Sequence, residues 1–171
     1  MKYSLFLITC FCCFSCGFSQ DKSNVEFVIR NVGIGVDGHF NTFNIETKFD
    51  DAGRLLNIKG EIKVASIETG IESRDKHLLK EAYFDVENYD TITLVSKKIN
   101  IKSANLYHVT ATLTIKGKTK VIPITLKLEK INNRYKLVSN FDIDRSYFNV
   151  GGRSFVMSNT VEINVVHYHN L

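Results

Sequence analysis

The residues with the clearest potential for chemistry are Arg74, Asp75 and His77, which stand close together in a stretch rich in charged side chains. A carboxylate and an imidazole that share a target can carry general acid and base catalysis. The surrounding pattern is helical, however, and residues two apart on a helix point in different directions. We therefore interpret the trio as structural, with Arg74 and Asp75 tying the helix to neighbouring turns through charge-assisted hydrogen bonds.

Two further histidines, His167 and His169, lie near the end of the chain as His-Tyr-His. Residues two apart on a strand share a face, so a surface metal site is geometrically open to them. No third ligand is close in sequence. The chain also has no Gly-x-Ser-x-Gly elbow, no HExxH and no phosphate-cradling glycine loop. We predict no catalytic residue, no metal and no cofactor, and that the protein is not an enzyme.

The overall composition fits a globular protein and argues against nucleic acid as a partner. The 171 residues carry 22 Lys and Arg against 18 Asp and Glu, a formal charge of +4. The two signs are interspersed, without a basic block or an arginine-rich run. Nothing in the sequence indicates the oligomeric state, and a homodimer is compatible with it.

Residues 1–19 have the pattern of a secretory signal peptide. Lys2 provides a positive start, an apolar run follows from Leu5 to Cys16, and small residues precede Gln20. The apolar run is shorter than the roughly 20 residues of a membrane span. We expect cleavage after Ser19 and a periplasmic or secreted protein. In the alternative, Cys16 becomes the lipidated N-terminus of an anchored lipoprotein. All four cysteines lie in this segment, so the mature chain is expected to contain no thiol.

Residues 20–171 are predicted to form one domain built mainly of β-strands. Apolar and polar residues alternate with period two through most of this region, as from Tyr107 to Ile115. We expect about eight antiparallel strands that close into an extended barrel, because closure removes exposed strand edges. A β-sandwich remains the alternative. A barrel of eight strands either holds one small ligand or is just filled by its own side chains.

One segment, residues 69–83, breaks the alternation and predicts a short amphipathic helix. Thr69 and Glu72 have the spacing of a capping box. Apolar residues recur near the helical period at Ile71, Leu78, Leu79, Ala82 and Tyr83. We expect this helix to cover or gate one end of the barrel.

The inward side of the strands predicts an elongated apolar cavity. Its expected lining is Ile58, Ile62, Val109, Leu113, Ile124, Phe141 and Ile163 from the strands, with Leu79 and Phe84 from the helix region. Burial of about ten tail carbons at roughly 0.8 kcal/mol each would supply about 8 kcal/mol before ordering costs. A long-chain lipid could therefore bind without any recognisable active site.

Several short motifs, in order, resemble the YceI-like family of bacterial polyisoprenoid-binding proteins. They are Val25-x-Phe27, Val36-x-Gly38-x-Phe40, Ser66-Ile67-x-Thr69, Arg74-Asp75-x-His77-Leu78, Phe84-Asp85-Val86, Leu113-Thr114-Ile115-x-Gly117-x-Thr119-Lys120 and Arg145-Ser146-x-Phe148. The resemblance runs from about Asn24 to Val166. It implies a lipocalin-like, eight-stranded barrel whose hydrophobic tunnel takes a long-chain isoprenoid or similar lipid.

The function expected from residues and resemblance together is that of an exported carrier. Its ligand would be a polyprenyl or quinone-type isoprenoid, or another amphiphilic lipid, and it would contact membranes transiently. Two other classes stay open. One is an enzyme that acts on a lipid headgroup, and the other is a filled structural or interaction barrel without a ligand.

Overall fold

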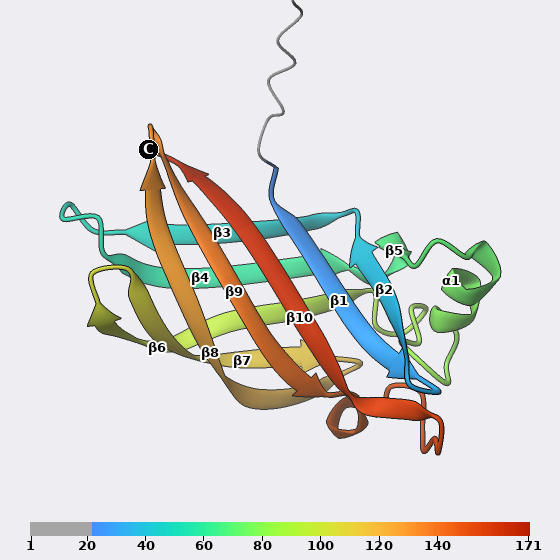
Figure 1. Ribbon diagram of the computed structural model, residues 1–171. Coiled ribbons are helices and arrows are strands. Elements are labelled where there is room, and N and C mark those ends of the chain that lie inside the picture. Colours follow the sequence, from blue (N-terminus) through green and yellow to red (C-terminus); the bar gives the residue numbers. More distant parts are fainter. Residues whose placement is uncertain (1–21) are drawn as a thin grey trace, which may run out of the picture.

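The computed structural model describes residues 22–171, so the predicted signal segment and its cysteines lie outside the described residues. One long curled sheet makes up most of the protein (Figure 1). Its strands are β1 (Asn24–Asn31), β2 (Ile34–Phe40), β3 (Phe43–Phe49), β4 (Leu55–Lys63), β5 (Ile67–Glu68), β6 (Thr91–Ser103), β7 (Leu106–Ile115), β8 (Lys118–Ile131), β9 (Arg134–Asp144) and β10 (Met157–Asn170). The helices are the 3-10 turns η1 (Val64–Ser66) and η2 (Arg145–Phe148) and the α-helix α1 (Glu72–Leu78).

All strand pairs are antiparallel, and the strand order is β3-β4-β6-β7-β8-β9-β10-β1-β2-β5. Most neighbours in the sheet are also neighbours in the chain, as in an up-and-down barrel. The first strand of the chain pairs with the last, since β1 lies between β10 and β2. The sheet therefore curls so that the first and last strands of the chain lie side by side.

The predicted barrel fold is confirmed, but with ten strand segments in place of eight. Only Asn41 and Thr42 separate β2 from β3, and only η1 separates β4 from β5. Across this double bend the backbone N–H of Asn41 donates to the carbonyl of Ser66 at 3.0 Å, and that of Lys63 donates to Thr42 at 2.9 Å. Thus β2 and β3 form one long bent strand, and β4 and β5 form a second one that bends beside it. Counted in this way, the barrel has eight strands.

Side chains close the barrel at the end away from α1. There β3 pairs through its backbone with β4, and the last residues of β10 pair with β9. The hydroxyl of Thr47 on β3 lies 2.9 Å from Nδ1 of His169 on β10. The ring of Phe49 stacks on Tyr135 with centroids 4.5 Å apart and lies 4.8 Å from the His169 ring. This contact set, which we call the seam, joins β3 to β9 and β10.

His167, next to the seam, is expected to make the protein less stable in acid. Burial, and secondarily the nearby His169, lower the pKa of His167 to about 4. The folded state thus disfavours its protonation, whereas the unfolded chain protonates near pH 6.5. Stability should be unaffected above pH 6.5 and should fall as the pH drops from 6.5 to 4. The loss is about 1 to 2 kcal/mol, allowing for solvent screening at this half-exposed ring.

Urea unfolding at several pH values measures this dependence. His167→Asn is the matched variant, since its amide can still reach the Ser23 hydroxyl, which lies 3.2 Å from Nδ1 of His167. The variant should lose most of the pH dependence between 6.5 and 4. An unchanged slope in the variant would show that His167 is not responsible.

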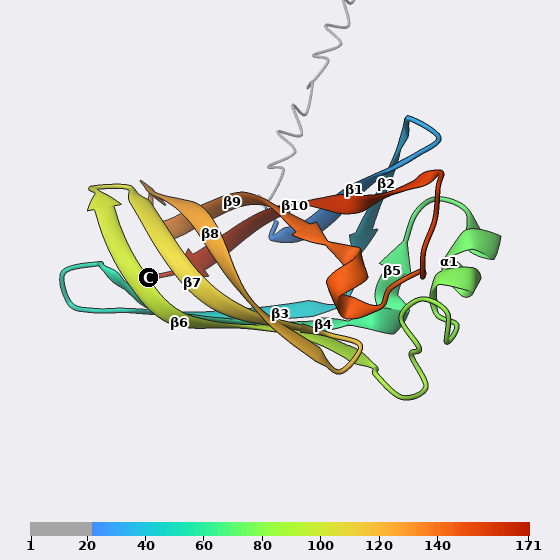
Figure 2. The same cartoon turned by 90° about the horizontal axis from the view of Figure 1, so that it is seen from below.

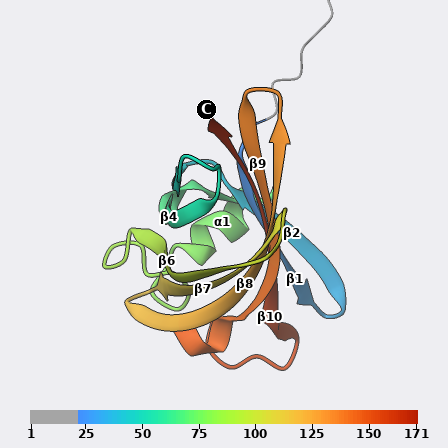
Figure 3. The same ribbon diagram turned by 90° about the vertical axis from the view of Figure 1, so that its left-hand side faces the viewer.

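The helix region differs from the prediction in two respects. The helix ends at Leu78 with Leu79 as its C-cap, and the chain then turns, so Ala82 and Tyr83 are not helical. The expected capping box is absent: Ile71 is the N-cap and no side chain caps the helix. Seen from below and end-on, α1 lies across one end of the barrel (Figures 2 and 3). No helix in residues 22–171 has the length and apolar character needed to cross a membrane.

Candidate binding cavity

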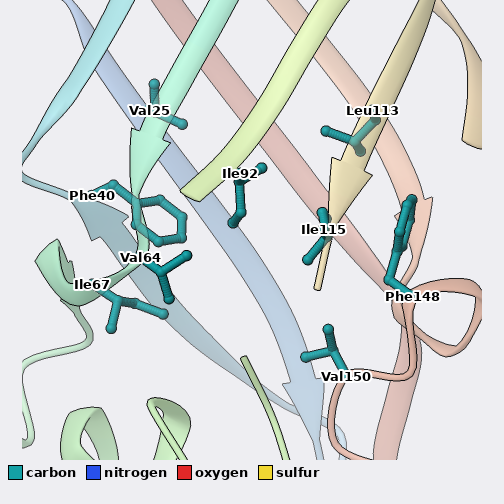
Figure 4. Close-up of a cluster of buried hydrophobic side chains, with 9 residues drawn as sticks. All are labelled: Val25, Phe40, Val64, Ile67, Ile92, Leu113, Ile115, Phe148 and Val150. Atoms are coloured by element: carbon teal, nitrogen blue, oxygen red, sulfur yellow. The ribbon is translucent and has the colours of Figure 1, made fainter. Parts of the chain in front are cut away.

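The barrel encloses a cavity of about 560 Å³. All ten strands contribute to its wall, and α1, η2 and the segments next to them close the α1 end. Its size lies within the roughly 300–1,000 Å³ of small-molecule sites. Figure 4 shows part of the wall, where buried apolar side chains from opposite strands and from the helical turns surround the interior. The wall residues drawn are Val25, Phe40, Ile67, Ile92, Leu113, Ile115, Phe148 and Val150, and Val64 is buried in the same cluster without lining the cavity.

The wall of the cavity is apolar, and the inward side chains do not fill the interior of the barrel completely. Odd-numbered residues of β7 and even-numbered residues of β8, such as Val109 and Ile124, point inward, as period-two strands require. Gly60 of β4 also lines the cavity, and a Cβ placed there would meet only Leu94, at 3.8 Å. Its pairing with Ile45 and Leu94 is regular. Gly60 therefore leaves open space in the wall without bending the strand.

Eight of the nine residues predicted to line the cavity do so. They are Ile58, Ile62, Phe84, Val109, Leu113, Ile124, Phe141 and Ile163. Leu79 is the exception: it packs against the apolar cluster of Figure 4 but faces a shallow outer hollow beside Lys76 and Lys80. Leu79 keeps helical backbone angles, and Leu78 just before it lines the cavity. Consecutive helical residues point about 100° apart, so Leu79 faces outward. That these residues contact a ligand remains a prediction.

Several further lining residues follow from the same alternation. Val25, Phe27 and Ile29 of β1 are one strand face of the sequence pattern and all line the cavity. Val161 and Val165 flank Ile163 on β10 in the same way. Extending each predicted face along its whole strand would have found them.

A group of polar lining residues lies at the α1 end, while Glu26 of β1 and Glu61 of β4 add carboxylates from the strands. Thr69, Ser73, Arg74 and His77 border the cavity at the α1 end. Ser73 and His77 are four residues apart and Arg74 and His77 three apart, so they share one side of α1. The rest of the wall is largely apolar. An amphiphilic ligand could therefore place its polar group at α1 and its tail along the barrel.

Arg74 and Asp75 both bind Thr69, at the start of the turn before α1. Arg74 donates from Nε to the Thr69 hydroxyl at 2.7 Å and from Nη2 to the Thr69 carbonyl at 2.6 Å. The Asp75 carboxylate accepts the Thr69 backbone N–H at 3.0 Å and also its hydroxyl. This explains the missing capping box, because the Thr69 hydroxyl donates to Asp75. His77 instead packs edge-on against Tyr83, with centroids 5.0 Å apart.

Asp75→Asn is expected to loosen α1 by about 1 to 2 kcal/mol, because an amide oxygen accepts more weakly than a carboxylate. The change should appear as faster amide exchange in residues 69–78 and a lower unfolding midpoint. Glu72→Gln is a matched control, since Glu72 pairs on the exposed surface with Lys76 at 2.6 Å and should matter little. Unchanged exchange in the Asp75 variant would contradict a structural role.

The position of Arg145 could not be foreseen from the sequence. It is 3% exposed and lines the cavity from η2. Its guanidinium donates to four backbone carbonyls: Nε to Ser158 at 2.8 Å, Nη1 to Val150 at 2.7 Å and Gly152 at 2.9 Å, and Nη2 to Met157 at 3.3 Å. The loop between η2 and β10 is thus wrapped around one buried cation.

The described residues contain no group of three or more His, Cys, Asp or Glu side chains placed to hold a metal ion. The two histidines considered from the sequence have other contacts, His167 with Ser23 and His169 with Thr47. Asp75 and His77 do not form a hydrogen-bonded pair among the contacts of α1. Among residues 22–171, His77 thus lies beside an apolar cavity without forming an acid–base pair with Asp75.

Fold and cavity define a lipocalin-like antiparallel barrel with an apolar interior cavity. The family model described as "YceI-like domain" matches residues 18–167, and the chain belongs to this family. A UPF0312 protein of Staphylococcus epidermidis is 33% identical over 105 residues, which cover 60% of this chain and 58% of that protein. One of Photorhabdus laumondii is 34% identical over 107 residues, which cover 61% and 54%. The chain thus matches less than three fifths of the length of these relatives.

Solved structures agree with the fold. BcnA of Burkholderia cenocepacia superposes with a TM-score of 0.81 at 27% identity, covering 86% of this chain and 96% of BcnA. A YCEI protein of Campylobacter jejuni has a TM-score of 0.75 at 25% identity, covering 80% and 85%. A polyisoprenoid binding domain from Saccharophagus degradans has a TM-score of 0.69 at 18% identity, covering 86% and 93%, and supports the fold alone.

Proposed function

We propose that this protein binds one long-chain isoprenoid, of polyprenyl or quinone type, or a similar amphiphilic lipid, and carries it after export. The observation that supports this most is the apolar cavity of about 560 Å³ inside the barrel. The family assignment points the same way, and a protein of the same fold is described as a polyisoprenoid binding domain. A carrier would also meet membranes transiently, when it loads and releases its lipid.

The cavity volume limits the length of the tail. If each methylene takes about 30 Å³, close to the volume of a water molecule in the liquid, 560 Å³ holds on the order of 20 such groups. That corresponds to about three or four isoprene units. Burying even ten carbons yields roughly 8 kcal/mol, enough for micromolar binding before ordering costs. Longer tails would need to leave the barrel or expand it.

Groups with shifted pKa values often mark active sites. Two such groups are found in residues 22–171, and their positions fit a carrier. The pKa of Asp50 is lowered by hydrogen bonds within the turn between β3 and β4, and that of His167 is lowered beside the seam. Neither residue lines the cavity. A barrel filled by its own side chains is disfavoured by the cavity itself.

A series of prenyl alcohols of increasing length, titrated into delipidated protein, tests this proposal. Affinity should rise with each added isoprene unit, by about 0.8 kcal/mol per buried methylene at most, and level off near 15 to 20 carbons. Turnover products should not form. Affinity that does not depend on tail length, or the absence of binding, would refute the lipid carrier.

Export is part of the proposal and has its own test. Intact-mass analysis of protein from the native host should give a chain that begins at Gln20 and carries no thiol. A mass increased by acyl chains on Cys16 would instead show a lipoprotein anchored at the membrane surface. Either result leaves the cavity argument unchanged.

A further inference from the structure

Four strongly exposed apolar side chains gather at the α1 end of the barrel, and we call them the tip patch. Val32 and Ile34, at the turn between β1 and β2, are each 70% exposed. Phe155 and Val156, in the loop before β10, are 108% and 59% exposed. The backbone N–H of Val32 donates to the carbonyl of Val156 at 2.8 Å, which fixes the two loops together. Figures 1 and 2 show them side by side, projecting from the barrel.

The turn itself holds an apolar residue at a strained position. Val32 and Gly33 have φ angles of +52° and +77°. Two consecutive residues with positive φ form the usual tight hairpin turn, in which Asn, Asp or Gly is strongly preferred at the first position. A β-branched residue there is a clear outlier. The turn thus exposes a valine at the expense of backbone stability.

The tip patch lies directly next to the cavity wall. Asn31 and Met157, which pair across β1 and β10, both line the cavity. Ile34 is the β2 partner of Asn31, and Val156 precedes Met157 in the chain. In each of the two loops, a residue of the tip patch is thus the chain neighbour of a residue that lines the cavity. A lipid that leaves the cavity at this corner would stay on apolar surface.

Positive charge accompanies the patch. Arg30 and Arg153 are exposed beside it, and neither takes part in an ion pair found among residues 22–171. The stretches 27–36 and 145–161 contain no Asp or Glu. Arginines around protruding Phe and Val side chains match the headgroup region of an anionic bilayer, where cations meet phosphates and apolar groups reach the acyl chains.

We propose that the tip patch docks the protein on an anionic lipid bilayer, with Phe155 and the turn at Val32 inserted into the interface and Arg30 and Arg153 on the phosphates. A stable protein partner or a second copy needs about 800 Å² on each side, whereas four protruding side chains offer a few hundred. The biological purpose of docking rests on the proposed function, because docking would bring the cavity to the membrane from which the lipid is loaded. The docking itself needs no ligand.

The protein contains no tryptophan, so a single introduced one reports on its own surroundings. Phe155→Trp places the reporter in the tip patch. Leu56→Trp is the matched control, on a 59% exposed residue at the start of β4. The strand β4 begins at the end of the barrel away from α1 (Figure 1). The probe is vesicles of phosphatidylcholine with about a quarter phosphatidylglycerol, which should bind about tenfold more tightly than pure phosphatidylcholine.

With vesicles, the tryptophan emission of the Phe155→Trp variant should shift to shorter wavelength and be quenched by brominated lipid, while that of the Leu56→Trp variant should not change. No shift in either variant, or equal shifts in both, would overturn the proposal. A shift in the Phe155→Trp variant without vesicles that grows with protein concentration would show that a second copy covers the patch, and would also overturn it.

Two substitutions separate docking from folding. Phe155→Ser should weaken vesicle binding about tenfold, the loss expected for one aromatic side chain. Val32→Asn should weaken vesicle binding while raising the unfolding midpoint, because asparagine suits the turn better. Full vesicle binding by both variants would overturn the proposal. Prenyl alcohol binding should be normal in both, so a failure of docking is distinguishable from a failure of the carrier function.

Discussion

Replacing Leu113 by glutamate is expected to abolish lipid uptake. Leu113 is 6% exposed on β7 and lines the cavity. A carboxylate there would lie among apolar side chains, and lipid in the cavity would remove the water that solvates it. Desolvation of an unpaired charge costs several kcal/mol. Prenyl alcohol binding should fall at least 100-fold, as measured by calorimetric titration, with near-native circular dichroism.

Two further variants show whether the cavity is the site. Gly60→Leu adds an uncharged side chain to the cavity wall, and its Cβ would meet only the Leu94 side chain, at 3.8 Å. It should also weaken lipid uptake, most of all for the longest tails. Leu56→Glu adds the same charge at an exposed position of β4 and should bind normally. Wild-type affinity in both cavity variants would place the ligand elsewhere.

Replacing Arg145 by methionine is expected to lower the free energy of unfolding strongly. It removes the donors to the carbonyls of Val150, Gly152, Met157 and Ser158 while keeping most of the side-chain volume. Each buried carbonyl left without a donor costs about 1 kcal/mol or more. The loss should be about 3 kcal/mol in urea unfolding. The loop before β10 should also become protease-sensitive.

Arg153→Met is the matched control, because Arg153 is exposed in the same loop. It should change the free energy of unfolding by less than about 0.5 kcal/mol. Comparable losses in both variants would mean that the loop tolerates no hydrophobic substitution, and that the hydrogen bonds of Arg145 are not the cause.

The strands could be predicted because their inward faces repeat with the strand period. The alternation from Tyr107 to Ile115 leaves its apolar members buried, and the same reasoning placed seven strand residues of the cavity lining correctly. Leu79 was misplaced because the sequence does not show which side of the helix faces the barrel: Leu78 lines the cavity and Leu79 does not. Seven residues of helix are also too few to fix where a helical stripe ends, and the helix ends at Leu78, before Ala82 and Tyr83 of the predicted stripe.

Other features depend on contacts that no local pattern encodes. The bend at Asn41 depends on hydrogen bonds to residues more than 20 positions away, and the burial of Arg145 depends on carbonyls that a folded loop directs at it. Whether the barrel is hollow depends on strand tilt and on the total volume of inward side chains. The same inward residues are compatible with a filled barrel, so the cavity had to be seen in three dimensions.

Native mass spectrometry of the protein purified without detergent from its own host shows whether the barrel holds a lipid. We expect a complex with one lipid per chain, which organic extraction converts to the bare protein and which one added equivalent of a prenyl alcohol of about 15 to 20 carbons restores. Protein that is bare when isolated, and stays bare in excess prenyl alcohol, would contradict the proposed lipid binding.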